Sequence, residues 1–106
     1  MVDGDTFHYR GTVIRISDID APETHPSRCT YEARLGERAT IRLSELLSGG
    51  RLTMVRENRD LDKYGRKLRV VIRDGRSIGK RLVSEGLARP WTGKRRPWCG
   101  NKDSFG

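Results

Sequence analysis

Cysteine and histidine are scarce in this sequence, and each occurs twice in 106 residues. Neither Cys29 nor Cys99 has a second cysteine in a CxxC arrangement, which argues against a zinc site. No neighbouring residue pairs with His8 or His25 as a metal ligand or a base. We therefore expect both histidines to be solvated and assign neither to catalysis.

Long apolar stretches are absent as well. The chain has no run of about 18 apolar residues, so we expect no membrane-spanning segment. Hydrophobic residues make up 34% of the chain and charged residues another 34%. Because the apolar residues cluster in periodic runs, this composition indicates one surface-rich globular domain with a core of modest size.

Acidic residues are outnumbered by basic ones, 14 against 22, and the formal charge is +8 with a pI near 10.2. Such an excess indicates a polyanionic partner, of which nucleic acid is the common one. A basic surface that only keeps the protein soluble is the alternative reading.

Four of the carboxylates are concentrated in two short N-terminal segments. They are Asp3, Asp5, Asp20 and Glu23. A glycine between the first two permits a tight turn, and a proline restricts the chain between the last two. Like charges gathered this closely repel one another unless a cation lies among them or their pKa values rise. Oxygen ligands without cysteine or clustered histidine suit calcium or magnesium rather than zinc.

Periodicity predicts a β-hairpin at residues 6–16, strands at residues 52–57 and 67–72, and a short helix from Ser77 to about Glu85. This order of elements, with a longer helix between the strands, indicates a small closed β-barrel that has a helix plugging one end.

The longer helix is expected to start at Tyr31 behind a Thr30 cap and to end before two glycines. Its apolar stripe consists of Leu35, Ala39, Leu43, Leu46 and Leu47. We assign the stripe to core packing and give it no chemistry. Charged residues, Glu32 among them, are expected to cover the remaining faces.

Arg15 precedes Asp20 by an odd number of positions, so one straight strand would place the two side chains on opposite faces. For both to reach one site, we predict a bend near residues 17–18.

Five motifs follow one another in a fixed order between residues 2 and 88. They are Val2-Asp3-Gly4-Asp5-Thr6, Arg15 five positions before Asp20, Asp20-Ala21-Pro22-Glu23-Thr24, Asp62-Lys63-Tyr64-Gly65-Arg66, and Leu82-Val83-Ser84-Glu85-Gly86-Leu87-Ala88. With them the chain resembles the staphylococcal nuclease (thermonuclease) family, the SNase-like domain. Any one of these motifs alone is weak, since single arginines are usually surface charges and residues 62–65 could be only a β-turn.

The resemblance implies an OB-fold, mainly β with helices: a five-stranded Greek-key barrel with a helix between strands and a second short helix. In the family a strand precedes the Asp-Gly-Asp turn, and only Met1 and Val2 correspond to it here. We expect either a truncated first strand with an open sheet edge or a lost upstream segment that carried a signal. The resemblance covers residues 1–88 of the single domain, and residues 89–106 form an irregular tail without a clear equivalent of the family's helix.

The implied activity is calcium-dependent hydrolysis of phosphodiester bonds in single-stranded DNA and RNA, with 3′-phosphate products. An anionic phosphodiester requires a site that neutralises phosphate, positions a water molecule and takes its proton. The resemblance assigns these roles residue by residue. One Ca²⁺ is held by Asp5, Asp20 and the Ala21 carbonyl; the catalytic residues are Arg15, Arg66 and Glu23; the terminal phosphate is bound by Lys63 and Tyr64; Asp3 and Thr6 lie just outside the metal ligands.

The alternative function is a catalytically silent OB-fold module that only binds nucleic acid, and a third reading is a weakly folded part of a larger protein. In the tail, Trp91 or Trp98 could stack on a base or pin the tail to the barrel. Cysteine parity favours a Cys29–Cys99 disulfide over two free thiols, and the bond would place the protein in an oxidising compartment, secreted or periplasmic. We expect a monomer without a protein partner.

Overall fold

The structure, a computed structural model, describes residues 3–24 and 27–99.

The first two strands form the expected hairpin. β1 (Thr6–Tyr9) and β2 (Thr12–Ile16) pair antiparallel across a tight turn that ends at Gly11. Both central residues of this turn have positive φ, which is the twist that suits a two-residue hairpin loop.

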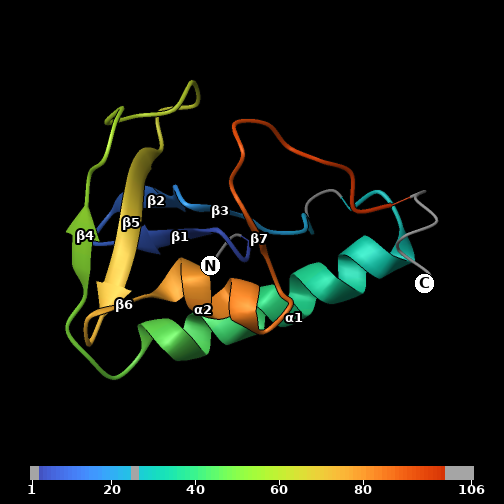
Figure 1. Cartoon of the computed structure of the whole chain (residues 1–106), viewed down its shortest axis with the longest axis horizontal. Helices are drawn as coiled ribbons and strands as arrows, with labels where there is room; N and C mark the ends of the chain where they lie inside the picture. Colours follow the sequence, from blue (N-terminus) through green and yellow to red (C-terminus); the bar gives the residue numbers. More distant parts are fainter. Residues whose placement is uncertain (1–2, 25–26, 100–106) are drawn as a thin grey trace.

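The main sheet is built around β5 (Lys67–Arg73), which runs parallel to β2 and antiparallel to β4 (Thr53–Val55) and β6 (Arg76–Ser77). The strand order is β1-β2-β5-β4, with β6 also paired to β5 (Figure 1). The strand predicted at residues 67–72 is confirmed. The strand predicted at residues 52–57 is shorter and spans only Thr53–Val55, the residues that pair with β5.

A separate pair of short strands joins the N-terminal motif, here residues 3–24, to the tail. The chain bends at residues 17–18, as predicted, and then forms β3 (Ile19–Asp20). β3 pairs antiparallel with β7 (Arg89–Pro90). The expectation of a tail without strand structure is therefore wrong at its first two residues, which are too few to leave an alternating pattern in the sequence.

The expected closed barrel does not form within the part of the chain that the structure describes. β1 and β4 are the two ends of the main sheet, and β3 leaves that sheet to pair with β7 instead. The architecture is a mixed sheet with two helices, an OB-type arrangement in which the barrel stays open.

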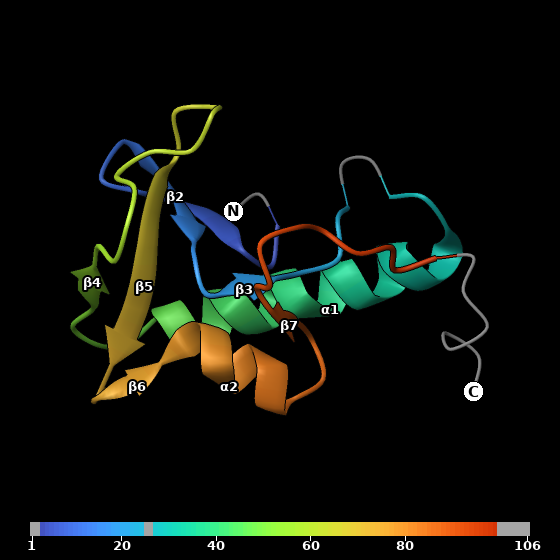
Figure 2. The same cartoon turned by 45° about the horizontal axis from the view of Figure 1, so that its top comes forward.

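Two helices, α1 (Thr30–Leu47) and α2 (Ile78–Ser84), lie side by side against the sheet (Figures 1 and 2). Ser77 caps α2 as predicted, but α1 begins one residue early, because the Sγ of Cys29 caps it by accepting from Glu32 N at 3.4 Å. Within the described ranges, neither helix is long and apolar enough to cross a bilayer.

The apolar stripe of α1 packs into the core as predicted. Its first three members, Leu35, Ala39 and Leu43, are buried, and the two leucines at its end are partly buried. Phe7 of β1 and Leu82 of α2 belong to the same core cluster. This core holds the sheet against α1 and so fixes the N-terminal motif over the helix.

Two glycines allow the N-terminal motif to lie directly on α1. A Cβ at Gly4 would lie 2.6 Å from the Cβ of Ala39, and a Cβ at Gly36 would lie 2.7 Å from the Cγ2 of Thr24. Real Cβ atoms do not approach so closely, so a larger residue at either position would push the motif off the helix. Gly4 is thus required by space, rather than by the tight turn expected from the sequence.

Candidate active site

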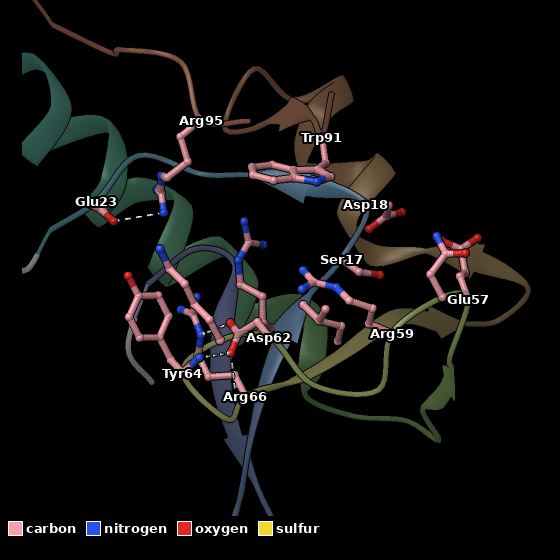
Figure 3. Close-up of a pocket in the computed structure, with 14 residues that line it drawn as sticks. Ser17, Asp18, Glu23, Glu57, Arg59, Asp62, Tyr64, Arg66, Trp91 and Arg95 are labelled. Atoms are coloured by element: carbon pink, nitrogen blue, oxygen red, sulfur yellow. Dashed lines mark hydrogen bonds and ion pairs between the residues drawn. The ribbon is translucent and has the colours of Figure 1, made fainter. Parts of the chain in front are cut away.

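An open groove of about 810 Å³ lies between the β4–β5 loop and the segment after β7, which rise on the same side of the molecule (Figures 1 and 3). Its lining residues include five cations and four carboxylates: Arg15, Arg59, Lys63, Arg66, Arg95, Asp18, Glu23, Glu57 and Asp62. The positive net charge of the chain is therefore not concentrated in the groove. Three of the groove arginines, Arg15, Arg66 and Arg95, are each paired with an acidic neighbour.

Asp5 and Asp20 lie below the groove and not in its lining, because each is only 3% exposed. Arg15 joins them: its Nη1 lies 3.6 Å from Asp5 Oδ2, and its Nη2 lies 4.0 Å from Asp20 Oδ1. The bend at residues 17–18 makes this possible, because it turns Asp20 back toward the face that Arg15 occupies. The structure thus brings these three predicted residues together in one buried cluster.

Asp5 is held by hydrogen bonds from the end of β2 and from the residue that follows β3. Its backbone carbonyl accepts from Ile16 N at 2.8 Å, and its Oδ2 accepts from Ala21 N at 3.0 Å. The hydroxyl of Thr6 donates to Asp5 Oδ1 at 3.0 Å and lies 3.5 Å from Arg66 Nη1, from which it accepts. Thr6 therefore links the carboxylate cluster to a groove arginine.

Burial raises the pKa of the Asp20 carboxyl above its ordinary value, and the charge of Asp5 raises it further. The positive charge of Arg95 opposes this rise in pKa most strongly, followed by the charge of Arg15. Asp20 Oδ1 is buried, and no described residue donates a well-aligned hydrogen bond to it, although Arg95 Nη2 lies 3.0 Å away. This oxygen keeps lone pairs that a cation can use.

Arg15 is only 6% exposed and is partly committed to the backbone. Its Nη1 donates to the carbonyls of Ile16 and Ile19, the latter at 2.9 Å. The guanidinium lies 5.5 Å from the centre of the Trp91 ring, which separates it from part of the solvent. A phosphate in the groove would meet the rest of the guanidinium.

Arg66 is held by the turn that precedes it. Asp62 Oδ2 accepts from Arg66 Nε at 2.6 Å, and Asp62 Oδ1 accepts from the backbone N–H groups of Tyr64 and Arg66, each at 2.9 Å. Tyr64 is 71% exposed, and its ring lies 5.2 Å from Lys63 Nζ and 5.3 Å from Arg66 Cζ. All four residues line the groove (Figure 3).

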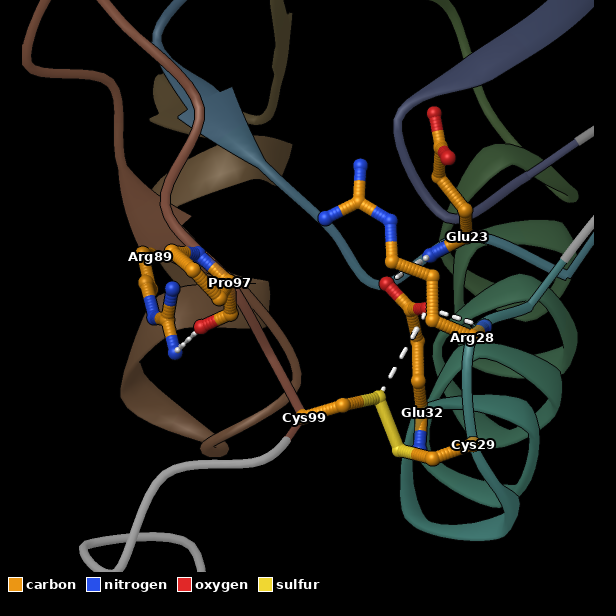
Figure 4. Close-up of a disulfide and its surroundings, with 7 residues drawn as sticks. All are labelled: Glu23, Arg28, Cys29, Glu32, Arg89, Pro97 and Cys99. Carbon is orange, nitrogen blue, oxygen red and sulfur yellow. Dashed lines mark hydrogen bonds between the residues drawn. A yellow bond between two sulfur atoms is a disulfide. The ribbon is translucent and has the colours of Figure 1, made fainter.

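Glu23 also lines the groove, and its Oε1 lies 3.0 Å from Arg95 Nη1. Its backbone N–H donates to Glu32 Oε2 at 3.3 Å, and Arg28 N donates to Glu32 Oε1 at 2.7 Å (Figure 4). The expectation that Glu32 lies on an outer face of the helix is wrong, because the side chain is 2% exposed and satisfies the backbone of the loop. Glu32 is a positioning residue for Glu23 that periodicity did not reveal.

Asp3 does not line the groove and, among the described residues, forms no hydrogen bond with Asp5 or Asp20. Its Oδ1 accepts from the N–H of Thr24 at 3.2 Å and from the Thr24 hydroxyl at 2.8 Å. It therefore fastens the chain immediately after Glu23, which is a supporting place outside the predicted ligand set.

The donor set suits a hard divalent cation. Asp5 and Asp20 offer carboxylate oxygens, and Ala21 offers a main-chain carbonyl next to them. Residues 3–24 and 27–99 contain no group of three or more Asp, Glu, His and Cys side chains placed to hold a metal ion. A cation here would therefore rely on two carboxylates, the carbonyl and water.

The tail is fastened across the site by a disulfide between Cys29 and Cys99, whose Cα atoms are 6.0 Å apart (Figure 4). Its two tryptophans lie in different places. Trp98 is 6% exposed and stacks on the guanidinium of Arg89, with 3.7 Å from Cζ to the ring centre, so it pins the tail to the fold. Trp91 is 39% exposed and forms part of the groove wall (Figure 3).

The sequence matches the family described as Staphylococcal nuclease homologue over residues 13–104. The chain belongs to this family. A relative in Bacillus subtilis (strain 168), SPbeta prophage-derived endonuclease YokF, is 44% identical over 94 residues, which cover 83% of this chain and 31% of that protein. Endonuclease YncB of the same organism is 40% identical over 94 residues, covering 83% of this chain and 44% of that protein. The chain therefore spans less than half the length of either relative.

In this staphylococcal nuclease homologue, sequence reasoning missed Arg95. It lies 3.0 Å from Asp20 and 3.0 Å from Glu23, and its Nη2 donates to the Ala21 carbonyl at 3.3 Å. The sequence does contain a signal, because a disulfide at Cys99 brings the basic run at residues 94–96 to the loop that follows Glu23.

Proposed function

We propose that the chain is a calcium-dependent nuclease that hydrolyses phosphodiester bonds of single-stranded DNA and RNA and leaves 3′-phosphates. One observation carries the proposal: Arg15, Arg66 and Glu23 line a single groove, and Arg15 also contacts the buried carboxylates beneath it. Membership of the family and the endonuclease names of two relatives support the same activity.

The acidic and the basic residues of the site are proposed to have different roles. Asp5, Asp20 and the Ala21 carbonyl would hold one Ca²⁺, which supplies Lewis-acid polarisation of a phosphate oxygen when bound. Arg15 and Arg66 present guanidinium groups to the same phosphate, where charge increases as the reaction proceeds. Because Nε of Arg66 is committed to Asp62, the outer edge of its guanidinium is the part that meets substrate.

Glu23 is the residue proposed to orient or deprotonate the attacking water. Its backbone is fixed by Glu32, and the chain after it is fixed by Asp3, so the carboxylate is presented to the groove from a restrained loop. In this structure the carboxylate is paired with Arg95. The ion pair engages Oε1 of the carboxylate, so opening of the pair would free this oxygen for the water.

The groove walls favour a strand with unpaired bases. Lys63 and Tyr64 would bind the terminal phosphate, and the exposed faces of Tyr64 and Trp91 offer surfaces on which bases can stack. A duplex keeps its bases stacked on one another, so this contact is open to single strands.

The compartment proposed is an oxidising one, so that the protein is secreted or periplasmic. The Cys29–Cys99 disulfide supports this, because structural disulfides persist outside the reducing cytosol. We propose a monomer, and size-exclusion chromatography with light scattering would test it.

The test is cleavage of labelled single-stranded DNA, single-stranded RNA and duplex DNA, first with calcium and then with a chelator. We expect calcium-dependent cleavage of both single strands, with product masses that show 3′-phosphates. Arg66→Ala should reduce the rate by about two to four powers of ten, as loss of one preorganised cation does. Arg38→Ala, which removes an exposed arginine outside the groove, is the matched control and should cleave normally. Binding of the strands without cleavage would instead identify a nucleic-acid-binding module.

A further inference from the structure

Arg95 contacts the residues to which the proposed function assigns the metal ion and the base. Its Nη2 lies 3.0 Å from Asp20 Oδ1 and donates to the Ala21 carbonyl at 3.3 Å. Its Nη1 lies 3.0 Å from Glu23 Oε1, and Figure 3 shows this pair at the edge of the groove. One guanidinium therefore touches two of the three proposed ligands and the proposed base.

The charges of the cluster leave room for Arg95 or for a divalent ion, but not for both. Asp5, Asp20 and Glu23 carry three negative charges, of which Arg15 offsets one. A buried uncompensated charge is costly, and Arg95 offsets a second one. A divalent ion on the same oxygens would lie within a few ångströms of that guanidinium and repel it.

The geometry points to Arg95 as a resident cation that occupies the ion's place and is displaced when the ion binds. The inference rests on the proposed function. Arg95 lowers the affinity for the ion, and its departure frees the carboxylate of Glu23. Binding of the ion would thus also free the proposed base, because displacement of Arg95 breaks its contacts with both Asp20 and Glu23.

The segment that carries Arg95 is suited to this movement. Residues 92–97 are exposed, so the side chain can leave without disturbing the core. The segment is anchored before Arg95, where Trp91 N donates to Asp18 O at 3.0 Å, and after it, where Arg89 donates to Pro97 O at 3.2 Å and Cys99 is bonded to Cys29 (Figure 4). A displaced Arg95 therefore remains beside the site at a high effective concentration.

The test is titration calorimetry of calcium into the full chain without substrate. We expect Arg95→Ala to bind calcium about tenfold more tightly than the wild type, because it removes a competitor whose coupling to the ion is negative. Arg96→Ala is the matched control: it removes the same charge one residue away, from an exposed arginine that forms no ion pair among the described residues. This control measures the general effect of lost positive charge and should stay near the wild type.

A second readout is the thermal unfolding of the same proteins. Without calcium Arg95→Ala should melt below Arg96→Ala, and calcium should raise its Tm by more than it raises that of the control. If Arg95→Ala does not fold, Arg95→Gln keeps most of the side-chain length without the charge and gives the same comparison.

Equal or weaker calcium affinity in Arg95→Ala than in Arg96→Ala overturns the inference, and so does an absence of calcium binding in all the variants. Cleavage by the wild type is measured separately, with calcium and with chelator. Calcium-dependent cleavage together with equal affinities would reject only the role of Arg95. Tighter binding by Arg95→Ala with no cleavage by the wild type would reject only the nuclease.

Discussion

Asp62 binds Arg66 through both the backbone N–H and the side-chain Nε, at 2.9 and 2.6 Å. Burial raises the pKa of the Asp62 carboxyl, but the hydrogen bonds from Arg66 and Tyr64 together outweigh burial, and the pKa lies below its ordinary value. The carboxylate is therefore ionised at neutral pH. It orders the turn and holds a groove arginine in one orientation.

Replacement of Asp62 by Asn should uncouple these two tasks. The asparagine oxygen can still accept from the backbone, but its amide group cannot accept from Arg66 Nε. We expect kcat on single-stranded DNA to fall by about 10- to 100-fold, as when a supporting partner of a site residue is lost, and the Tm to fall slightly, because the lowered pKa of Asp62 means that its charge also stabilises the fold. Steady-state kinetics with and without calcium would measure it.

The double variant Asp62→Asn/Arg66→Ala provides the sharper comparison. If Asp62 acts through Arg66, the double variant should be no slower than Arg66→Ala alone, because the two losses are not additive. Losses that multiply would show that Asp62 acts on substrate independently. Glu37→Gln, which removes an exposed carboxylate from α1, should have normal kinetics.

Local patterns predicted most of the regular structure. Alternation predicted the hairpin, helical spacing predicted α1 and α2, and the odd separation of Arg15 and Asp20 predicted the bend after β2. The open barrel and the β3–β7 pair could not be predicted in this way. They depend on a contact between residues about 70 positions apart, and a two-residue strand has no period of its own.

Predictions for the site likewise depended on whether a residue belongs to a local motif or acts through a tertiary contact. Residues within a motif, such as Asp5 and Arg66, were predicted as site residues because the resemblance to the family assigns them roles. Glu32 and Arg95 were missed because their roles come from tertiary contacts: one is buried under the loop before α1, and the other arrives with the disulfide-linked tail. A charged residue on a helix or in a loop is ordinarily expected to point outward. Only the tertiary packing shows which charged residues do not.

The disulfide should account for a large part of the stability. Cys29 and Cys99 are separated by 70 residues, and closing a loop of this length restricts the unfolded chain by about 4 kcal/mol. Reduction, or the double change Cys29→Ser/Cys99→Ser, should therefore lower the free energy of unfolding by roughly that amount. Urea unfolding with and without reductant measures it, and mass spectrometry after alkylation verifies the state of the thiols. Identical midpoints would exclude a structural role for the bond.

Glu85 should give the protein a defined loss of stability in acid. Hydrogen bonds from Arg42, and then from Arg81, lower the pKa of Glu85 from 4.5 to about 2. Because the folded-state pKa is the lower one, this contribution is complete above about pH 4.5 and disappears as the pH falls toward 2. Arg42 and Glu85 also join α1 to α2.

Glu85→Gln should therefore lower the Tm by a few degrees at neutral pH and reduce its pH dependence between pH 4.5 and 2. Thermal melts at several pH values would measure both effects. Glu37→Gln provides the reference, because it removes an exposed carboxylate that makes no ion pair among the described residues. A curve for Glu85→Gln that runs parallel to the wild type would contradict the assignment.

Asp20 should show a conflict between stability and activity. The carboxylate is 3% exposed beside Asp5, and burial raises its pKa although Arg95 and Arg15 oppose the rise, so its ionised form remains costly without a divalent cation. Asp20→Asn should raise the Tm measured in chelator, abolish the increase that calcium causes and reduce cleavage by at least about a hundredfold. Calorimetric melts with and without calcium would test the first two effects. Cleavage at the wild-type rate would remove Asp20 from the proposed ligand set.

The two tail tryptophans should separate binding from folding. Trp91 is 39% exposed in the groove wall, whereas Trp98 is 6% exposed against Arg89. Trp91→Ala should weaken binding of single-stranded DNA by about 1–3 kcal/mol, the value of one base–aromatic stack, which appears as a higher KM with little change in Tm. Trp98→Ala should instead lower the Tm, with substrate affinity changing only as far as the tail loosens.

Trp91→Phe is the matched control, because it retains a flat face over Arg15 and should recover most of the affinity. Fluorescence anisotropy of a labelled single strand in chelator measures binding without cleavage, and the same titration with duplex DNA shows whether the contact needs unpaired bases. If Trp91→Ala binds single strands as well as the wild type but melts at a lower temperature, then Trp91 acts as a cover over Arg15. In that case recognition of the bases has to be assigned to Tyr64 on the opposite wall of the groove.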